Sequence, residues 1–346
     1  MQFNKKIIRA RAPLRLGLAG GGTDVSPYCD KFGGYVLNMT IDRYAYATIE
    51  RLNEEVVQFI ASDQKTEELR LISYPLVLNG KLDLHKATYN YMVKHYNNGS
   101  FIPIKLTTSC DAPPGSGLGS SSTLVVVMVL SFSELFGLSL DDYDIASIAY
   151  KIERIDCGLK GGRQDQYSAT FGGINFMEFY DNDRAIIVPL RVKNWIICEL
   201  EASLVLFYTG VSRESAKIIE EQSDNVKAGL INTIKAMHNI KHEAELMKKC
   251  ILNGDFIGIV ESLRQGWENK KLSSQSVSST HIDNIYNEAI SAGALAGKVS
   301  GAGGGGFILF FVPPEQRMNV VRALNQFDGE VSNCHFTKNG AQSWTI

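Results

Sequence analysis

The first half of the chain alternates apolar and polar residues, the pattern of strands with one buried face. Residues 6–18 alternate charged and apolar side chains until three glycines, Gly20 to Gly22, break the pattern. Further strands are expected, in chain order, at residues 34–50, 54–61, 101–109, 173–180 and 185–192. The last two runs flank Asp181-Asn182-Asp183, a turn sequence that predicts a hairpin.

The pattern changes after Ser120. Thr123 to Leu138 is a continuous apolar stretch, and its length and the stop at Gly137 favour a buried helix over a strand. Asp141 or Ser139 can cap a following helix, because both types accept hydrogen bonds from free N–H groups at a helix start. That helix would place four isoleucines on one face: Ile145, Ile148, Ile152 and Ile155.

The second half of the chain is more helical and more polar. Helices are expected at residues 212–252, 254–270 and 281–296, with a serine-rich break at 273–280 and a strand at 307–312. Asp255 stands near the start of the second of these helices. The change of character places a domain boundary between residues 180 and 200, which divides the chain into residues 1–190 and 191–346.

Composition and charge exclude several classes of function. The 346 residues are 45% hydrophobic and 21% charged, ordinary values for a globular protein, and the net charge of −2 with a pI near 6.3 argues against a nucleic-acid or membrane-surface binder. The six cysteines stand singly, which gives zinc and thioredoxin motifs no support. No signal peptide is evident, and the longest apolar run, Leu124 to Leu130, is too short to cross a bilayer. A cytoplasmic location is expected.

The most informative element is a glycine- and serine-rich loop, residues 113–123, placed between a strand and a helix. Glycines let the backbone press against an anion, and the helix start offers free N–H groups and the positive end of its dipole. The loop therefore predicts a phosphate site, although a plain turn with serine caps is the alternative. The residues expected to bind a nucleotide are Pro114, Gly115, Ser116, Gly117, Leu118, Gly119, Ser120, Ser121 and Ser122.

Two other nucleotide motifs do not fit. No lysine follows the glycines of this loop, so it is not a Walker A loop, and the paired motifs of protein kinases are absent from the sequence. Gly301, Gly303 and Gly306 match the spacing of a dinucleotide fingerprint, but they follow a helix and precede a strand, the reverse of its context. A loop that closes over a ligand is the better interpretation.

A third glycine element, residues 12–24, carries candidate polar chemistry. Arg15 could neutralise charge on a phosphoryl group in transfer, and Asp24 could accept hydrogen bonds from substrate hydroxyls. Taken alone, Arg15 would more often be a surface residue of a strand.

Together these three elements resemble the motifs of the GHMP kinase superfamily, in the family's own order. The first motif looks like Ala12 to Asp24, the ATP loop like Pro113 to Thr123, and the third motif like Lys298 to Phe307. The resemblance implies a two-domain α+β fold, with a ribosomal-S5-like N-terminal domain and a ferredoxin-like C-terminal domain. ATP and a small-molecule alcohol would meet between the two domains, with Mg²⁺ as cofactor.

The resemblance narrows to the sugar kinases. Residues 161–169 look like the segment of that branch that carries its catalytic aspartate, and residues 208–215 and 267–272 are most similar to D-glycero-D-manno-heptose 7-phosphate kinases, with fucokinases as close relatives. The implied reaction is phosphorylation of the anomeric hydroxyl, which gives a 1,7-bisphosphate. Galactose is doubtful as the substrate, because Gly21 and Gly22 replace a glutamate-histidine pair and leave room for a longer or phosphorylated sugar.

The resemblance assigns roles residue by residue. Asp165 would be the general base and Arg15 its partner, which stabilises charge in the transition state. Ser121 and Glu153 match the Mg²⁺-linked residues of the family. The residues expected to bind the sugar substrate are Gly21, Gly22, Thr23, Asp24, Arg163, Arg213, Gly303 and Gly304.

Several alternatives stay open. The distal phosphate of a heptose 7-phosphate needs a cation, and the candidates, each otherwise an ordinary surface charge, are Arg213, Arg163, Lys160 and Arg43. Another sugar 1-kinase, such as a fucokinase, is the second interpretation, and a sugar- or nucleotide-binding regulator without activity is the third. A homodimer through residues 212–252 competes with packing of that segment in its own domain. His238 and His242 lack a third metal ligand and are expected on a solvated helix face.

Overall fold

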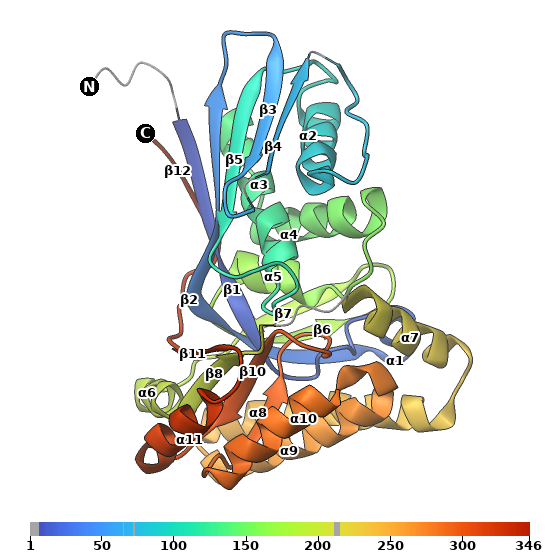
Figure 1. Ribbon diagram of the computed structural model, residues 1–346. Helices are drawn as coiled ribbons and strands as arrows, with labels where there is room; N and C mark the ends of the chain where they lie inside the picture. The colour runs from blue at the N-terminus through green and yellow to red at the C-terminus, as the bar shows by residue number, and fades with distance from the viewer. Residues whose placement is uncertain (1–6, 65, 72, 211–214) are drawn as a thin grey trace.

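The structure is a computed structural model that describes residues 7–64, 66–71, 73–210 and 215–346. It has two parts, one above the other in Figure 1. The upper part is an eight-stranded sheet with helices packed on it, and the lower part is a four-stranded sheet with its own helices. This arrangement confirms the predicted two-domain α+β fold.

Two long antiparallel strands, β1 (Ile7–Ala19) and β2 (Gly34–Arg51), form the centre of the first sheet. The sheet runs in the order β12-β1-β2-β5-β3-β4, and β6 also pairs with β2 and carries β7 on its other edge. The remaining strands are β3 (Val56–Ala61), β4 (Thr66–Leu71), β5 (Ile104–Cys110), β6 (Ile174–Phe179), β7 (Ala185–Pro189) and β12 (Gln342–Thr345). The antiparallel pairing of β6 with β7 confirms the predicted hairpin.

The register between β1 and β2 shifts between Pro13 and Arg15, and again between Gly17 and Ala19. Such bulges add a residue to one strand and turn the side chains that follow. Beyond Ala12 the alternation of buried and part-exposed side chains stops, and every residue of β1 is buried. Arg15, placed between the two irregularities, therefore lies inside the molecule.

Helices α2 to α5 lie on one side of this sheet (Figure 1). The central one, α3 (Ser120–Phe136), is buried along most of its length and ends at Gly137, whose φ of 65° suits glycine. Asp141 caps α4 (Asp142–Tyr150) in a reciprocal capping box with Asp144, as predicted. The other helical elements here are α1 (Tyr28–Phe32), α2 (Asp83–Tyr96), the π-helix η1 (Lys151–Asp156) and α5 (Gln164–Phe171).

The second sheet has the order β11-β8-β10-β9 and is antiparallel throughout. Its strands are β8 (Leu204–Tyr208), β9 (Ala296–Val299), β10 (Phe307–Phe311) and β11 (Glu330–Asn333). The β8 and β10 runs are apolar at successive positions because both faces of the sheet are covered. The helices of this part are α6 (Asn194–Ser203), α7 (Ser215–Lys227), α8 (Ile231–Asn253), α9 (Phe256–Ser273), α10 (Thr280–Ser291), α11 (Arg317–Leu324) and the 3₁₀ turns η2 (Gln275–Val277) and η3 (Pro314–Gln316).

One hydrophobic core joins the two parts. It contains Leu14, Leu16 and Leu18 of β1 together with Leu206 of β8 and Leu309 of β10. Because β1 contributes to the core of the second part, the strand that carries Arg15 is fixed against both sheets. The site described below lies at this junction.

Some predicted elements are wrong. Residues 212–252 do not form one helix: α7 (Ser215–Lys227) and α8 are separate, and Gly229, with φ of 70°, stands at the break. Helices α2, α5 and α6 were not predicted. Asp255 does cap α9, as its position near that helix start suggested.

We propose that the domains divide between residues 190 and 191, after β7, with β12 returning to pair with β1 of the first sheet.

Candidate functional site

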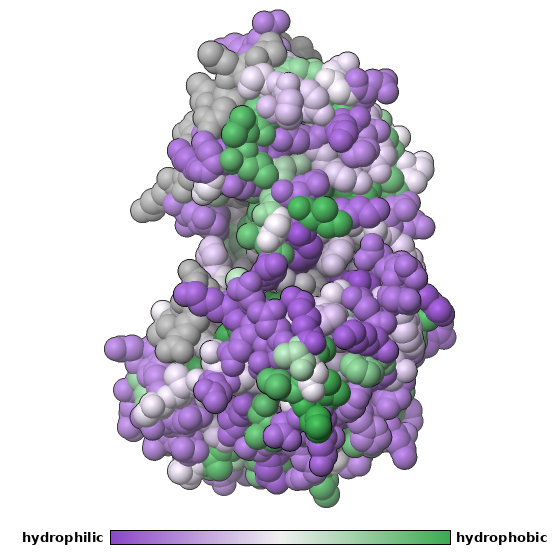
Figure 2. Space-filling model, turned by 90° about the vertical axis from the view of Figure 1, so that its right-hand side faces the viewer, coloured by the Kyte–Doolittle hydropathy of each residue, from purple (hydrophilic) through white to green (hydrophobic). Residues whose placement is uncertain are grey.

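A cavity of about 440 Å³ lies between the two parts. Its walls come from β1 and the loop after it, the loop before α3 and the first turn of that helix, residues 153–165, helix α7, one residue of α9 and the loop before β10. Figure 2 views the molecule from the side on which α7 lies and shows the surface hollowed between the upper and lower parts. All three glycine-rich elements of the sequence therefore meet at one cavity.

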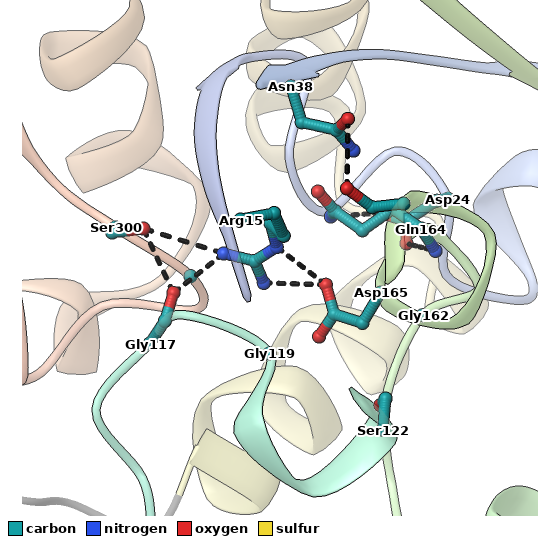
Figure 3. A network of polar contacts seen from close by, with 12 residues as sticks. Arg15, Asp24, Asn38, Gly117, Gly119, Ser122, Gly162, Gln164, Asp165 and Ser300 are labelled. Atoms are coloured by element: carbon teal, nitrogen blue, oxygen red, sulfur yellow. Dashed lines mark hydrogen bonds and ion pairs between the residues drawn. The ribbon is translucent and has the colours of Figure 1, made fainter. Parts of the chain in front are cut away.

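An ion pair between Arg15 and Asp165 lies in the wall of this cavity (Figure 3). Arg15 Nε donates to Asp165 Oδ1 over 2.7 Å, and Arg15 Nη2 lies 2.6 Å from the same oxygen. The arginine side chain is 5% exposed and that of the aspartate 19%. Within the described chain, Asp165 Oδ2 accepts no hydrogen bond, so one carboxylate oxygen is free to accept a proton from a ligand.

The rest of the Arg15 guanidinium is held by two loops. Arg15 Nη1 donates to the carbonyl of Gly117 over 2.6 Å and lies 3.4 Å from Ser300 Oγ, which itself donates to the same carbonyl. Arg15 thus joins β1, the loop before α3, the loop after β9 and the start of α5 (Figure 3).

Asp24 holds the start of α5 in place. Its Oδ2 accepts from the backbone N–H groups of Arg163 and Gln164 over 2.9 and 3.0 Å. Its Oδ1 accepts from the Gly22 N–H over 3.1 Å and from Gln164 Nε2 over 3.0 Å. The residue is 1% exposed. With four N–H donors, the carboxylate fixes the turn immediately before Asp165, and a bond to a sugar hydroxyl stays a prediction.

The loop before α3 is shaped by glycines in the left-handed region. Gly115, Gly117 and Gly119 have φ of 72°, 79° and 80°, which other residues rarely adopt. A Cβ on Gly117 would lie 2.4 Å from the Ser300 carbonyl oxygen, and one on Gly119 would lie 3.2 Å from Asp165 Cγ. The glycines therefore let the helix start, with its free N–H groups, approach the catalytic candidates.

Ser121 and Glu153 meet in the same wall. Ser121 Oγ donates to Glu153 Oε1 over 2.7 Å, and Gln166 Nε2 donates to Oε2 over 2.7 Å. Glu153 lies on η1, a π-helix that continues α4, and such helices often occur at functional sites. A hydroxyl beside a carboxylate is an oxygen donor set that Mg²⁺ accepts when nucleotide phosphates and waters complete its coordination. Among the residues the structure describes, no group of three His, Cys, Asp or Glu could hold a metal by itself.

Some predicted ligand residues turn away from the cavity. Thr23 is fully buried, and its hydroxyl bonds to the backbone of residues 20 and 35. Ser116 and Leu118 are also fully buried and do not line the cavity, whereas Pro114, Ser120, Ser121 and Ser122 do. Thr23, Ser116 and Leu118 therefore offer no exposed side chain to a ligand, and their part in the binding site stays a prediction.

The basic and glycine candidates are also partly wrong. The Arg163 guanidinium donates to the Tyr180 carbonyl and pairs with Asp30 and Asp183, away from the cavity. Gly303 and Gly304 lie against Val277 of η2, and Gly301 and Ala302 line the cavity in their place. Arg43 lies over the Phe307 ring. Arg213 is outside the described residues, whereas Lys160 does line the cavity.

Lys270 is a cavity residue that the sequence had not marked as part of the site. This residue of α9 is 4% exposed, lines the cavity and donates to the Gly301 carbonyl. The sequence does indicate that Lys270 lies on a buried helix face. Leu263, Trp267 and Lys270 are four and three residues apart, the spacing of one face of a helix, and all three are buried in α9. Arg154 was missed as well; it pairs with Glu153 and donates to Ser122 Oγ.

Two family models match the chain. The one described as the GHMP kinases N terminal domain matches residues 83–173, and the one described as GHMP kinases C terminal matches residues 247–329. The first match contains the glycine loop, Glu153 and Asp165, and the second contains Lys270 and the third glycine element. None of the described helices is long and apolar enough to cross a membrane.

Known proteins resemble the chain over its whole length. It is 47% identical to the D-glycero-alpha-D-manno-heptose 7-phosphate kinase of Campylobacter jejuni subsp. jejuni, an alignment that spans 99% of this chain and 100% of that protein. A crystal structure of a D-glycero-D-manno-heptose 1-phosphate kinase from Bacteroides thetaiotaomicron has 43% identity and a TM-score of 0.83, covering 98% of this chain and 99% of that one. The galactokinase of Lactococcus lactis, solved with galactose, has a TM-score of 0.76 at 17% identity over 97% and 95% of the chains, a likeness of fold alone.

The position of Asp24 predicts a structural role that one substitution tests. Asp24→Asn would point an amide N–H₂ at N–H donors and leave them unpaired, so we expect a loss of about 2–4 kcal/mol in the free energy of unfolding. The measurement is urea unfolding with Asp183→Asn as control, because that exposed carboxylate contributes at most about 1 kcal/mol. A raised KM for the sugar with wild-type stability would instead assign Asp24 to the substrate.

Proposed function

Because the chain belongs to the GHMP kinase family, we propose that it transfers the terminal phosphate of ATP to the anomeric hydroxyl of D-glycero-D-manno-heptose 7-phosphate. The product would be the 1,7-bisphosphate, a precursor for nucleotide-heptose and surface polysaccharide synthesis. The relative at 47% identity, a heptose 7-phosphate kinase, supports the substrate. The observation that carries the proposal is the Arg15–Asp165 pair beside the glycine loop.

In this proposal Asp165 is the base. Its unpaired Oδ2 faces the sugar hydroxyl and takes the proton as the hydroxyl oxygen bonds to the γ-phosphorus of ATP. The bond from that phosphorus to the bridging oxygen breaks, and ADP leaves with the electron pair. Arg15 holds Asp165 in place and offers positive charge to the transferring group, which is the main requirement of phosphoryl transfer.

The ATP phosphates would lie against residues 114–122. The N–H groups at the start of α3 and the three serine hydroxyls supply donors for phosphate oxygens. Ser121 and Glu153 would hold Mg²⁺, which neutralises charge on the phosphates when it is bound. Arg154, paired with Glu153 over 3.3 Å, adds a cation to this wall.

A heptose 7-phosphate also needs a cation for the phosphate that does not react. Two lysines, Lys160 and Lys270, line the cavity. Arg163 and Arg43, which the sequence suggested for this role, are committed to other contacts. The catalytic pair already contains Arg15, so Lys160 and Lys270 are additional cations. Their presence favours a phosphorylated sugar over a neutral one such as fucose.

The setting of the enzyme is also part of the proposal. All six cysteines are free thiols, the state expected in a reducing compartment, and we propose the cytoplasm as its location. A homodimer stays a prediction.

Mg²⁺-dependent ADP release tests the activity and the substrate together. The acceptors are heptose 7-phosphate, heptose 1-phosphate, mannose 6-phosphate, fucose, galactose and mevalonate. We expect turnover with heptose 7-phosphate and at least about 100-fold lower kcat/KM with the unphosphorylated sugars, because they lose a charge-assisted contact. Equal or faster turnover of fucose would instead identify the protein as another sugar 1-kinase, such as a fucokinase. Binding of a sugar phosphate without any turnover would support a regulator without catalytic activity.

Replacing the proposed base tests the mechanism. Asp165→Asn keeps the shape of the side chain but removes its capacity to accept a proton, so we expect kcat to fall by about 10²- to 10⁴-fold. The affinity for ADP, measured by calorimetry, should change by less than about threefold, since the nucleotide loop is untouched. Asp142→Asn, an exposed position outside the cavity, is the control. A kcat near that of the wild type would refute the assignment of Asp165.

A further inference from the structure

Lys270 is a buried cation held at the edge of the cavity. Its side chain leaves α9 from the face that also carries Trp267, which is buried in the core of the second part. The ammonium donates to the carbonyl of Gly301, in the loop before β10. Because the residue is 4% exposed and still lines the cavity, the protein has removed it from bulk water and presents it to a ligand.

The ammonium has no carboxylate partner. Within the described ranges, no Asp or Glu oxygen lies within 4.0 Å of Lys270 Nζ. The adjacent Lys271, in contrast, pairs with Glu268 over 2.8 Å, and Arg15 and Arg154 have Asp165 and Glu153. A buried ammonium without a counter-charge is costly and is rarely kept without a functional reason. An anionic group on the substrate would supply the missing counter-charge.

The charges around Lys270 also favour an anion. Burial lowers its pKa well below the ordinary value, and the nearby cations Lys298 of β9 and Arg15 of β1 lower this pKa further. Asp24 is the acidic neighbour that raises it, but the Asp24 carboxylate is already taken by four N–H donors. A dianion bound here would favour the charged form of Lys270 and offset its repulsion with the two neighbouring cations, Lys298 and Arg15.

Space for such an anion exists in front of the ammonium. Gly21 lines the cavity there, and a Cβ on Gly21 would lie 4.0 Å from Lys270 Nζ and 3.8 Å from Gln164 Nε2. The φ of Gly21 is outside the left-handed region, so its backbone does not require glycine. The absence of a side chain at this position leaves a volume bounded by an ammonium and an amide N–H₂, both hydrogen-bond donors.

We propose that Lys270 binds the phosphate that the sugar carries away from its reacting hydroxyl, and that Gly21 provides the space in which this phosphate lies. The inference rests on the proposed function and makes it more specific. Arg15 serves the reacting end and is paired with Asp165, whereas the Lys270 amine has no carboxylate partner and is left for the substrate. Lys270 is then a residue that selects a phosphorylated sugar over a neutral one.

The kinetic test compares Lys270→Met with Lys271→Met, two neighbouring lysines of which one lines the cavity. Lys270→Met should lower kcat/KM for heptose 7-phosphate by about 30-fold or more, mainly through KM, because a buried charged contact is lost. For the unphosphorylated heptose the loss should be below about threefold, and Lys271→Met should leave both values unchanged. Equal loss of kcat with both sugars would place Lys270 at the transferring phosphoryl group and overturn the proposal.

A second pair of variants tests the space. Gly21→Glu would place a carboxylate beside Lys270 and should abolish the preference for the phosphorylated sugar, whereas Gly21→Ala should keep most of it. Thermal unfolding of each variant shows whether it is folded. A Gly21→Glu protein that is folded and still prefers heptose 7-phosphate by the wild-type factor would contradict the proposal.

Calorimetry separates this inference from the activity, since it needs no turnover. Binding of heptose 7-phosphate is measured near neutral pH in two buffers with different ionisation enthalpies. Wild-type protein should take up more protons than Lys270→Met, because the bound dianion raises a pKa that burial, Lys298 and Arg15 had lowered. Tight binding and proton uptake without ADP release would refute the proposed reaction and keep the Lys270 site. Equal affinity and proton uptake in the two proteins would refute the site.

Discussion

The buried guanidinium of Arg15 is the interaction on which the site depends. A charge placed inside the molecule by the bulge in β1 must be fully paired, and its partners are Asp165, the Gly117 carbonyl and Ser300. These partners come from α5, the loop before α3 and the loop after β9. One cation therefore fixes the positions of three segments that are far apart in the sequence, and Asp165 is held in the wall of the cavity as a result.

Each further component of the site adds one constraint to this centre. Asp24 fixes the turn before Asp165. The core that β1 shares with β8 and β10 holds the two parts of the molecule together, so the loops that line the cavity stay close to one another. Glycines 115, 117 and 119 remove the side chains that would separate the start of α3 from Asp165. The cations of the cavity also differ in their pairing, since Arg15 and Arg154 contact carboxylates and Lys270 contacts a carbonyl.

Much of this could be predicted from the sequence because glycine patterns and strand alternation are local signals. The glycine loop, the Arg15–Asp165 pair and the Ser121–Glu153 pair all lie where the resemblance to GHMP kinases placed them. The directions of side chains in glycine-rich loops were not predictable, since tertiary contacts decide them. The Thr23 hydroxyl bonds to the backbone of residues 20 and 35, and Leu118 packs in the core that joins the two parts. Arg163 was misjudged because its partners, Asp30 and Asp183, are brought to it only by the tertiary fold.

We propose that the cavity directs phosphoryl transfer to the anomeric oxygen of a sugar that already carries a phosphate. Phosphorus NMR of the reaction with ATP, Mg²⁺ and heptose 7-phosphate tests this claim most directly. We expect a second phosphorus signal coupled to the anomeric proton, with the original phosphate ester unchanged. A new phosphate coupled to any other carbon-bound proton, or ATP hydrolysis without a second sugar phosphate, would contradict it.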